Sequence, residues 1–298
     1  MLAFVLGGGG SRGALQVGAL QVLMEAGIQP DMIIGTSVGA LNGAFLASNP
    51  TRAGLEQLTD IWLHVRDQDV FPGNNTLILW NMLRGRESFF ANGNWRTLLQ
   101  SNMPADYFGE LALPCYAVAT DMDSGATRVF GDDANDRLLD GLMSSTAIAP
   151  YHPPWTVDGR RYVDGGYTAL LPMREAMERG ANEIIALNLT GQLMPSEQVK
   201  SSFDMLSHII DLLMLRQVTS DVAYAHAYPH LRVKSIDLHP TAHMSVTDFS
   251  HTEELIAQGR AQASAALAED GWPAQRPTYW SPSHLMTTEQ PEMIDVQI

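Results

Sequence analysis

Cysteine is almost absent from this 298-residue chain. The one residue of this type, Cys115, has no partner for an internal disulfide, so a fold held together by disulfide bonds is excluded. Cys115 lies in an apolar run over residues 113–118 that is typical of a buried strand. Neither a helix start nor a basic neighbour is present to lower the pKa of its thiol. We therefore expect a structural rather than a catalytic cysteine.

Basic residues are also scarce. The chain has 18 Lys and Arg against 33 Asp and Glu, which gives a formal net charge of −15. Such a surface repels nucleic-acid phosphates and anionic lipid headgroups, so we expect no nucleic-acid partner. A neutral or zwitterionic lipid surface stays compatible with this charge. The composition does not indicate an oligomeric state.

Long uninterrupted hydrophobic runs are missing as well. Residues 1–6 are apolar but have no basic leader, which argues against a signal peptide. Residues 32–51 carry no charge, but glycine, serine, threonine and asparagine interrupt them. A buried strand, a tight turn and a buried helix fit this stretch better than a membrane span. We therefore expect a cytoplasmic protein.

Strand and helix patterns alternate from the start of the chain. Residues 2–6 and 32–35 read as buried strands, and residues 14–26 and 38–47 as helices, which predicts a parallel sheet covered by helices. Further strands are predicted at residues 115–120, 127–130, 162–164, 183–189 and 231–238, and further helices at 171–179, 203–224 and 253–268. We expect one α/β domain over residues 1–270 and an extended, proline-rich tail over residues 271–298.

Two segments have open interpretations. Residues 51–106 are rich in aromatic side chains, and form either a helical cap facing the substrate or a plain helical excursion with core aromatics (Trp62, Phe71, Trp80, Phe89, Phe90 and Trp95). Residues 203–218 are rich in Leu, Ile and Met. They form either a lipid-facing lid or interfacial helix, or a core or subunit contact.

A glycine-rich loop follows the first strand and opens the first helix. Its residues are Gly7, Gly8, Gly9, Gly10, Ser11, Arg12 and Gly13. The spacing matches the dinucleotide-binding pattern G-x-G-x-x-G, but the second strand does not end in the acidic residue that holds the ribose. Bared amides at a helix start also stabilise other anions, including the oxyanion of a tetrahedral intermediate. Arg12 either orients this loop or forms a surface salt bridge.

A candidate nucleophile, Ser37, stands between a strand and a helix. The sequence from Gly35 to Gly39 reads G-x-S-x-G, and in this context it is typical of a nucleophile elbow with an exposed hydroxyl. The flanking glycines leave room for close backbone approach. The structural alternative is that Ser37 only caps the helix that follows.

The most suitable partner for this serine is Asp164. None of the nine histidines has a distinctive setting, and no metal-ligand cluster is evident: His239 and His243 are four residues apart, but Pro240 argues against a shared helix face. Asp164 ends a short strand and precedes Gly165 and Gly166, and ligand sites gather at strand ends in parallel sheets. The alternative is an ordinary Asp-Gly turn.

Together, the glycine loop, the serine elbow and the Asp-Gly-Gly motif resemble the patatin-like phospholipase family over roughly residues 1–190, with residues 145–154 similar to its connecting segment. The resemblance implies a three-layer α/β/α fold and a Ser-Asp dyad without histidine. It makes Ser37 the nucleophile and Asp164 the base, and it places the oxyanion hole near Gly9 and Gly10, with Arg12 at the family's basic position.

The resemblance further implies hydrolysis of carboxylic esters of lipids through an acyl-enzyme intermediate, with no cofactor and no metal. Two positions depart from many family members: Gly7, where Asp is frequent, and Gly166, where Ala is frequent. The dyad needs a basic carboxylate, and we expect burial to raise the pKa of Asp164. The alternative function is a non-catalytic lipid- or nucleotide-binding module that uses the glycine loop.

Overall fold

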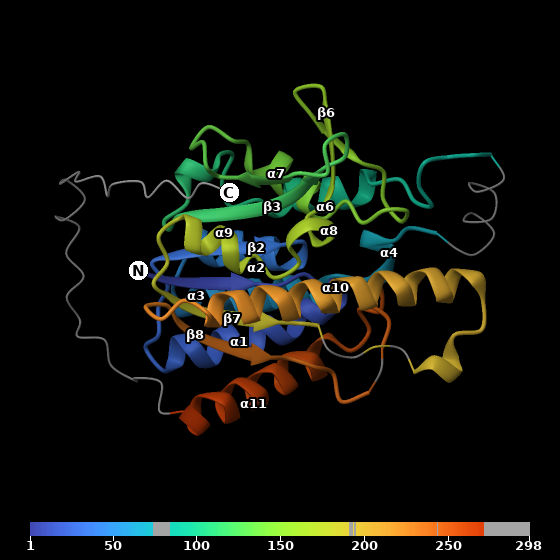
Figure 1. Ribbon diagram of the computed structural model, residues 1–298. Coiled ribbons are helices and arrows are strands. Elements are labelled where there is room, and N and C mark those ends of the chain that lie inside the picture. The colour runs from blue at the N-terminus through green and yellow to red at the C-terminus, as the bar shows by residue number, and fades with distance from the viewer. Residues whose placement is uncertain (74–83, 191–192, 194, 243, 271–298) are drawn as a thin grey trace, which may run out of the picture.

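A mixed, mainly parallel sheet of eight strands forms the centre of the molecule (Figure 1). The structure is a computed structural model and describes residues 1–73, 84–190, 193, 195–242 and 244–270. Hydrogen bonds join the strands in the order β5-β6-β3-β2-β1-β7-β8, and β4 also pairs with β3. The strands are β1 (Leu2–Leu6), β2 (Met32–Thr36), β3 (Cys115–Asp121), β4 (Thr127–Phe130), β5 (Trp155–Val157), β6 (Arg160–Asp164), β7 (Glu183–Asn188) and β8 (Arg232–Asp237).

Five of these strands, β3, β2, β1, β7 and β8, run parallel to one another. Both β1 and β2 are buried along their whole length, as their continuous apolar sequences predict for strands covered on both faces. Alternate side chains of β1 enter different cores: Phe4 packs on one face of the sheet and Val5 on the other. The predicted mainly parallel α/β architecture is therefore confirmed.

Helices cover both faces and complete three layers. The core on the Phe4 side includes residues of α1, α2, α3 and α11, and the core on the Val5 side includes residues of α8, α9 and α10. The helices are α1 (Gly13–Glu25), α2 (Val38–Ser48), α3 (Arg52–His64), α4 (Asp67–Val70), α6 (Gly93–Asn102), α7 (Leu138–Ser145), α8 (Gly166–Ala169), α9 (Met173–Glu178), α10 (Ser202–His226) and α11 (Thr252–Asp270), with short 3-10 helices η1 (Gly10–Arg12), η2 (Phe108–Glu110) and η3 (Ser196–Gln198).

The strand that carries Asp164 differs from the sequence expectation in its direction. β6 runs antiparallel to β3, although a parallel setting was expected for Asp164. The cause is a two-residue turn at Asp158 and Gly159, both with positive φ, which folds β6 back on β5. An Asp-Gly pair is the preferred sequence for such a turn, since Gly adopts positive φ without strain and Asp tolerates it.

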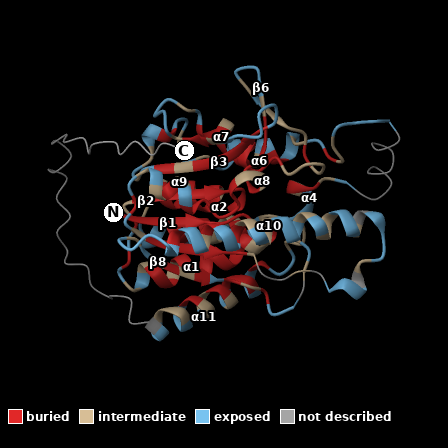
Figure 2. Cartoon of the chain, viewed as in Figure 1, coloured by how far each residue is buried: buried red, intermediate tan, exposed pale blue. Residues whose placement is uncertain are grey.

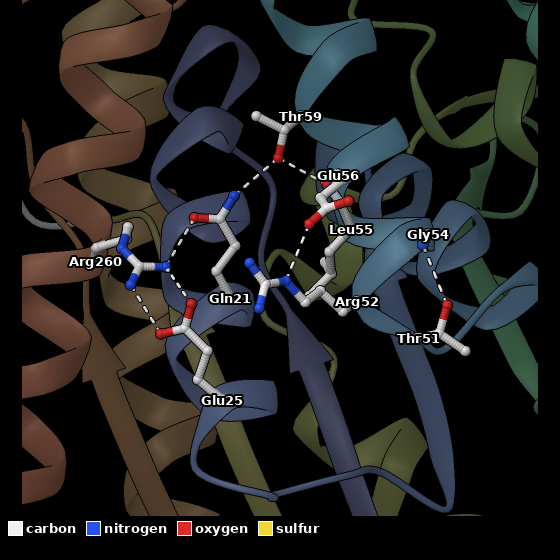
Figure 3. Close-up of polar contacts among 9 residues, drawn as sticks. All are labelled: Gln21, Glu25, Thr51, Arg52, Gly54, Leu55, Glu56, Thr59 and Arg260. Carbon is white, nitrogen blue, oxygen red and sulfur yellow. Dashed lines mark hydrogen bonds and ion pairs between the residues drawn. The ribbon is translucent and has the colours of Figure 1, made fainter.

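Helix α11 packs against α1, which follows the glycine loop. The two backbones meet at glycines: a Cβ on Gly18 would lie 2.0 Å from the Ile256 carbonyl oxygen, and one on Gly259 would lie 2.0 Å from that of Leu15. Polar contacts at the rim add to this packing (Figure 3). Arg260 of α11 donates to both carboxylate oxygens of Glu25 at 3.0 and 2.8 Å. These contacts fix α11 to α1, the helix that follows the glycine loop.

Four further expectations concern Cys115, membrane-spanning helices, the C-terminal tail and the cellular location. Cys115 is buried in β3, as predicted, and burial raises the pKa of its thiol to about 12. Within the described part of the chain, no helix combines the length and apolarity needed to cross a bilayer. Trp80 and the tail over residues 271–298 lie outside the described residues. The cytoplasmic location stays a prediction.

Candidate active site

Ser37 occupies a strained turn between β2 and α2. Its φ is 55° and its ψ −125°, a conformation that non-glycine residues rarely adopt. The hydroxyl makes no capping hydrogen bond to α2, so the helix-cap alternative does not describe its side chain. A Cβ on Gly35 would lie 2.3 Å from the Gly39 carbonyl, and one on Gly39 would lie 2.1 Å from the Leu6 carbonyl oxygen. The flanking glycines are therefore required by the close backbone contacts.

The sheet register brings Asp164 to this turn. Val118 of β3 pairs with Thr36 of β2 on one edge and with β4 on the other. The next residue, Ala119, pairs with β4 again and with Asp164 of β6. β2 and β6 therefore share one edge of β3, run toward each other and end at neighbouring positions. Ser37 directly follows Thr36, so the seryl and aspartyl residues meet where the two strands end.

The Asp164 carboxyl group is buried. Its Oδ1 accepts a hydrogen bond from the Gly166 amide at 2.8 Å, whereas Oδ2 has no partner of normal hydrogen-bond geometry among the described residues. Burial raises the pKa of Asp164 to about 6, and interactions with the Ser37 hydroxyl and the Gly166 amide act in the opposite direction. A carboxyl group with such a pKa and one open oxygen beside a serine is suited to accept a proton.

The short segment of residues 145–147 holds the main chains of both Ser37 and Asp164. The Ser37 amide donates to Oγ of Ser145 at 2.8 Å, and the Asp164 amide donates to the carbonyl oxygen of Ala147 at 3.0 Å. These bonds fix the two main chains relative to each other. Because the segment begins at the last residue of α7, the position of that helix sets the spacing of the Ser-Asp pair.

The glycine loop lies beside Ser37. A Cβ on Gly8 would be 3.3 Å from Cβ of Ser37. The Gly8 amide donates to Leu170 at 3.0 Å, and the Ser11 amide donates to Val246 at 2.8 Å. Within the described residues, the amides of Gly9 and Gly10 make no hydrogen bond. Two successive main-chain donors are therefore open for an anion next to the serine.

Arg12 orients this loop from inside. Its Nε donates to the Gly9 carbonyl oxygen at 3.3 Å. Burial lowers the pKa of Arg12, and the negative charge of Asp211 on α10 opposes that effect. Of the two roles open in the sequence, the loop-orienting one matches this hydrogen bond.

A buried polar network connects the loop helix with the serine helix. Nε2 of Gln16 donates to the Gly7 carbonyl oxygen at 2.8 Å, and Nδ2 of Asn42 donates to Oε1 of Gln16 and to the Gly13 carbonyl oxygen, both at 3.0 Å. Nε1 of Trp62 donates to Oδ1 of Asn42 at 2.8 Å. The network ties α1, α2 and α3 together beneath the site, so the loop and Ser37 are held by shared buried contacts.

An apolar cavity of about 80 Å³ opens at Ser37. Aromatic residues from the segment over residues 51–106 line it: Trp62, Phe71 and Trp95. All three are also buried in the core, as the interpretation of a helical excursion with core aromatics expects, and the substrate-facing cap stays a prediction. His152 lies in the cavity wall, stacked on Phe71 with ring centroids 5.1 Å apart, and burial lowers its pKa.

The family model for patatin-like phospholipases matches residues 4–177, which include the serine elbow, the glycine loop and Asp164. The chain belongs to the patatin-like phospholipase family. It is 33% identical over 190 residues to patatin-like phospholipase domain-containing protein 7 of Rattus norvegicus, and 30% identical over 193 residues to neuropathy target esterase sws of Drosophila melanogaster. These alignments cover 63% and 64% of this chain but only 13% of each relative.

Among solved structures, VipD from Legionella pneumophila is similar to this patatin-like chain, with a TM-score of 0.47 and 14% identity over 89% of this chain and 66% of that chain.

The described residues contain no group of three or more His, Cys, Asp or Glu side chains that could hold a metal ion.

Sequence reasoning missed three features of this patatin-like site. Ser145 holds the Ser37 amide, His152 lies in the cavity wall although no histidine has a distinctive setting in the sequence, and Val246 contacts the glycine loop from far along the chain. The similarity of residues 145–154 to the family's connecting segment was the one available signal for Ser145. Nothing in the sequence links the Ser11 amide to Val246, because that contact depends on the path of residues 239–250.

Proposed function

We propose that this chain is a serine lipid acyl hydrolase, a carboxylic ester hydrolase with Ser37 as nucleophile and Asp164 as general base. The observation that carries the proposal is the meeting of a strained, uncapped serine, which lines an apolar cavity, with a buried, partly unpaired carboxyl group. Membership of the patatin-like phospholipase family supports it, as does the esterase named among the similar proteins.

In the first half-reaction, Oγ of Ser37 attacks the ester carbonyl carbon and its proton passes to Asp164. The carbonyl oxygen becomes an oxyanion, and the amides of Gly9 and Gly10 donate to it, the role expected from the glycine loop. When the tetrahedral intermediate collapses, the bond between the carbonyl carbon and the alcohol oxygen breaks, and the departing oxygen takes the proton from Asp164. The products are a free alcohol and an acyl ester on Ser37.

In the second half-reaction, water takes the place of the alcohol. Asp164 accepts a proton from the attacking water, the same two amides stabilise the second oxyanion, and the acid leaves as Ser37 regains its proton. One residue thus serves as base and acid in turn, which requires a pKa near the working pH. The pKa of about 6 that burial gives Asp164 meets this requirement better than the ordinary value of 3.8.

The acyl group of the substrate would occupy the cavity. Its walls are largely aliphatic and aromatic and Ser37 lines it, so we expect the acyl chain inside the cavity and the alcohol part outside it. This arrangement fits phospholipids, galactolipids and simple acyl esters alike, and it requires no cofactor in the mechanism.

The nucleotide-binding alternative fits the loop poorly. A pyrophosphate cradle needs several open amides in a row, but those of Gly8 and Ser11 are committed to main-chain carbonyl oxygens. A Cβ on Gly9 would also lie 2.8 Å from the Leu189 side chain, which leaves no room for a large ligand on the Cα side of this residue. The remaining pair of donors matches a single oxyanion.

A fluorophosphonate probe tests the proposal directly. We expect the intact protein to form an adduct at Ser37, located by peptide mass spectrometry, and to hydrolyse a water-soluble butyrate ester. Ser37→Ala should abolish both signals while keeping the thermal unfolding midpoint close to that of the parent. Absence of an adduct in the folded parent, under conditions where a control serine hydrolase reacts, would refute the assignment. Thermal stabilisation by NAD or ATP would then support the binding-module alternative.

A further inference from the structure

Exposed large apolar side chains concentrate on one helix. Five of them lie within residues 205–213 of α10 and are between 42% and 64% exposed: Met205, Leu206, Ile209, Leu212 and Leu213. Figure 2 shows this N-terminal half of α10 in pale blue and tan, extending beyond the red core. A soluble domain rarely leaves so many aliphatic side chains together in water without a partner.

The five residues share one side of the helix. Their spacing of three, four and seven positions places them along one stripe, the α10 apolar face. The charged residue of α10 at the same angle is Arg216, whereas Asp211 interacts electrostatically with Arg12, on the side toward the glycine loop. The α10 apolar face therefore carries no carboxylate among its described residues.

The inner side of the same helix touches the candidate active site. Oε1 of Gln217 accepts a hydrogen bond from the Leu170 amide at 3.0 Å, and the Leu170 carbonyl oxygen accepts the Gly8 amide. Cε of Met214 would lie 3.5 Å from a Cβ on Gly166, next to Asp164. One helix thus has its apolar outer side in solvent and its inner side against the residues proposed to cleave the ester.

We propose that the α10 apolar face docks on a neutral or zwitterionic lipid surface and so brings the residues proposed to cleave the ester close to that surface. The inference rests on the proposed function, because a lipid acyl hydrolase must reach esters that are packed in such a surface. Exposed aliphatic side chains along one side of a helix insert into the boundary between headgroups and acyl chains. The net charge of −15 opposes binding to anionic lipids and sets the preference for uncharged or zwitterionic headgroups.

A second copy of the chain fits this face less well. Five half-exposed aliphatic side chains present on the order of a few hundred Å² of apolar surface, whereas a stable dimer buries about 800 Å² per partner. Two copies that each carry a charge of −15 also repel each other.

The test uses the full chain, phosphatidylcholine vesicles and a water-soluble butyrate ester. The variant is Leu206→Ser combined with Leu213→Ser, and its control is Leu63→Ser, a comparably exposed leucine on α3. In vesicle flotation we expect the parent and the Leu63→Ser control to bind. We expect the double variant to bind at least tenfold more weakly while its kcat/KM on the soluble ester stays within twofold. Ser37→Ala should float like the parent.

Several outcomes would overturn the inference. One is a parent that hydrolyses the soluble ester but does not bind vesicles, and another is a double variant that binds them like the parent. A third is preference for vesicles containing anionic phosphatidylglycerol. A fourth is a dimer in sedimentation analysis that the double substitution converts to a monomer without a change in lipid binding. A folded parent that does not hydrolyse the soluble ester would instead refute the proposed function. Failure of the docking proposal and failure of the proposed function are therefore distinguishable.

Discussion

The main-chain amide of Ser37 donates to Oγ of Ser145 at 2.8 Å. The bond is buried and joins the strained elbow to the end of α7, two residues before the carbonyl oxygen that accepts the Asp164 amide. A backbone with φ of 55° persists only when its surroundings hold it in place. Ser145 is thus a positioning residue for the elbow, which suggests the first prediction.

Ser145→Ala should lower kcat on a soluble ester about ten- to 100-fold, with a smaller change in KM. The substitution leaves a buried amide without its acceptor, which costs roughly 1–3 kcal/mol of folding free energy and loosens the elbow. Ser144→Ala is the matched control, because the neighbouring hydroxyl is buried with no hydrogen-bond partner among the described residues. We expect that variant to keep parental kcat and stability. Equal kinetics for both variants would contradict the positioning role.

Asp164→Asn should lose at least 1,000-fold in kcat and yet gain stability at alkaline pH. Burial raises the pKa of Asp164 in the folded protein from 3.8 to about 6, so the folded state binds a proton more tightly than the unfolded chain. Stability therefore falls as the pH rises from about 4 to about 6, and the buried carboxylate costs ~1–3 kcal/mol above that window. Urea unfolding at pH 4 and pH 8 measures this. A stability difference that does not grow with pH would disagree with it.

The pH–rate profile should rise through the same pKa. Only the deprotonated form of Asp164 accepts the Ser37 proton, so kcat/KM should increase about tenfold per pH unit below pH 6 and level off above it. Steady-state rates on an uncharged soluble ester, with circular dichroism at each pH to confirm folding, provide the measurement. A rate that stays flat down to pH 4.5 would rule out this carboxyl group as the base.

Gly10→Ala should damage the oxyanion loop beyond the cost of its backbone conformation. Gly10 has a φ of 60°, and a Cβ there would lie 2.3 Å from the Val246 carbonyl oxygen. Gly27→Ala is the control, since Gly27 has a φ of 72° and open space around it. We expect the control to lose about 1 kcal/mol of stability and to keep its kcat. Gly10→Ala should lose more stability and at least tenfold in kcat, measured by urea unfolding and ester hydrolysis.

Leu98→Trp should shift the proposed ester hydrolysis toward short acyl chains. Leu98 lines the cavity and is only partly buried, so an indole ring enters the cavity without a large strain on the core. In a series of p-nitrophenyl esters we expect kcat/KM for decanoate to fall at least tenfold more than that for acetate. Leu63→Trp, outside the cavity on α3, should leave the ratio unchanged. A uniform loss across chain lengths would indicate that acyl groups bind elsewhere.

Local sequence predicted most of what positions Ser37. The strand, turn and helix around it follow from short apolar runs and glycines, and the structure has them within one residue of their predicted ends. The pairing of Ser37 with Asp164 was expected from family resemblance, but its physical basis was not visible. That basis is the shared edge of β3, and strand pairing depends on contacts between distant segments.

The features that escaped prediction share this non-local origin. The direction of β6 is set by the turn at Asp158 and Gly159, which was not recognised as a hairpin. The lid, interface or core alternatives for residues 203–218 were undecided because α10 uses both of its sides, and apolar residues on all sides give no amphipathic signal. Which side of α10 is buried depends on how the rest of the chain packs against it.

The position of β1 in the sheet defines what must be kept in any shortened version of this protein. β1 is central only because β7 and β8 extend the sheet beyond it, and both lie after residue 177, where the family match ends. A fragment that ends at that point would leave β1 as an exposed, apolar edge strand. Such an edge promotes strand pairing between molecules and therefore aggregation. Expression trials should therefore retain the chain through α11. A library of truncations scored for soluble yield would trace this boundary more sharply than sequence similarity does.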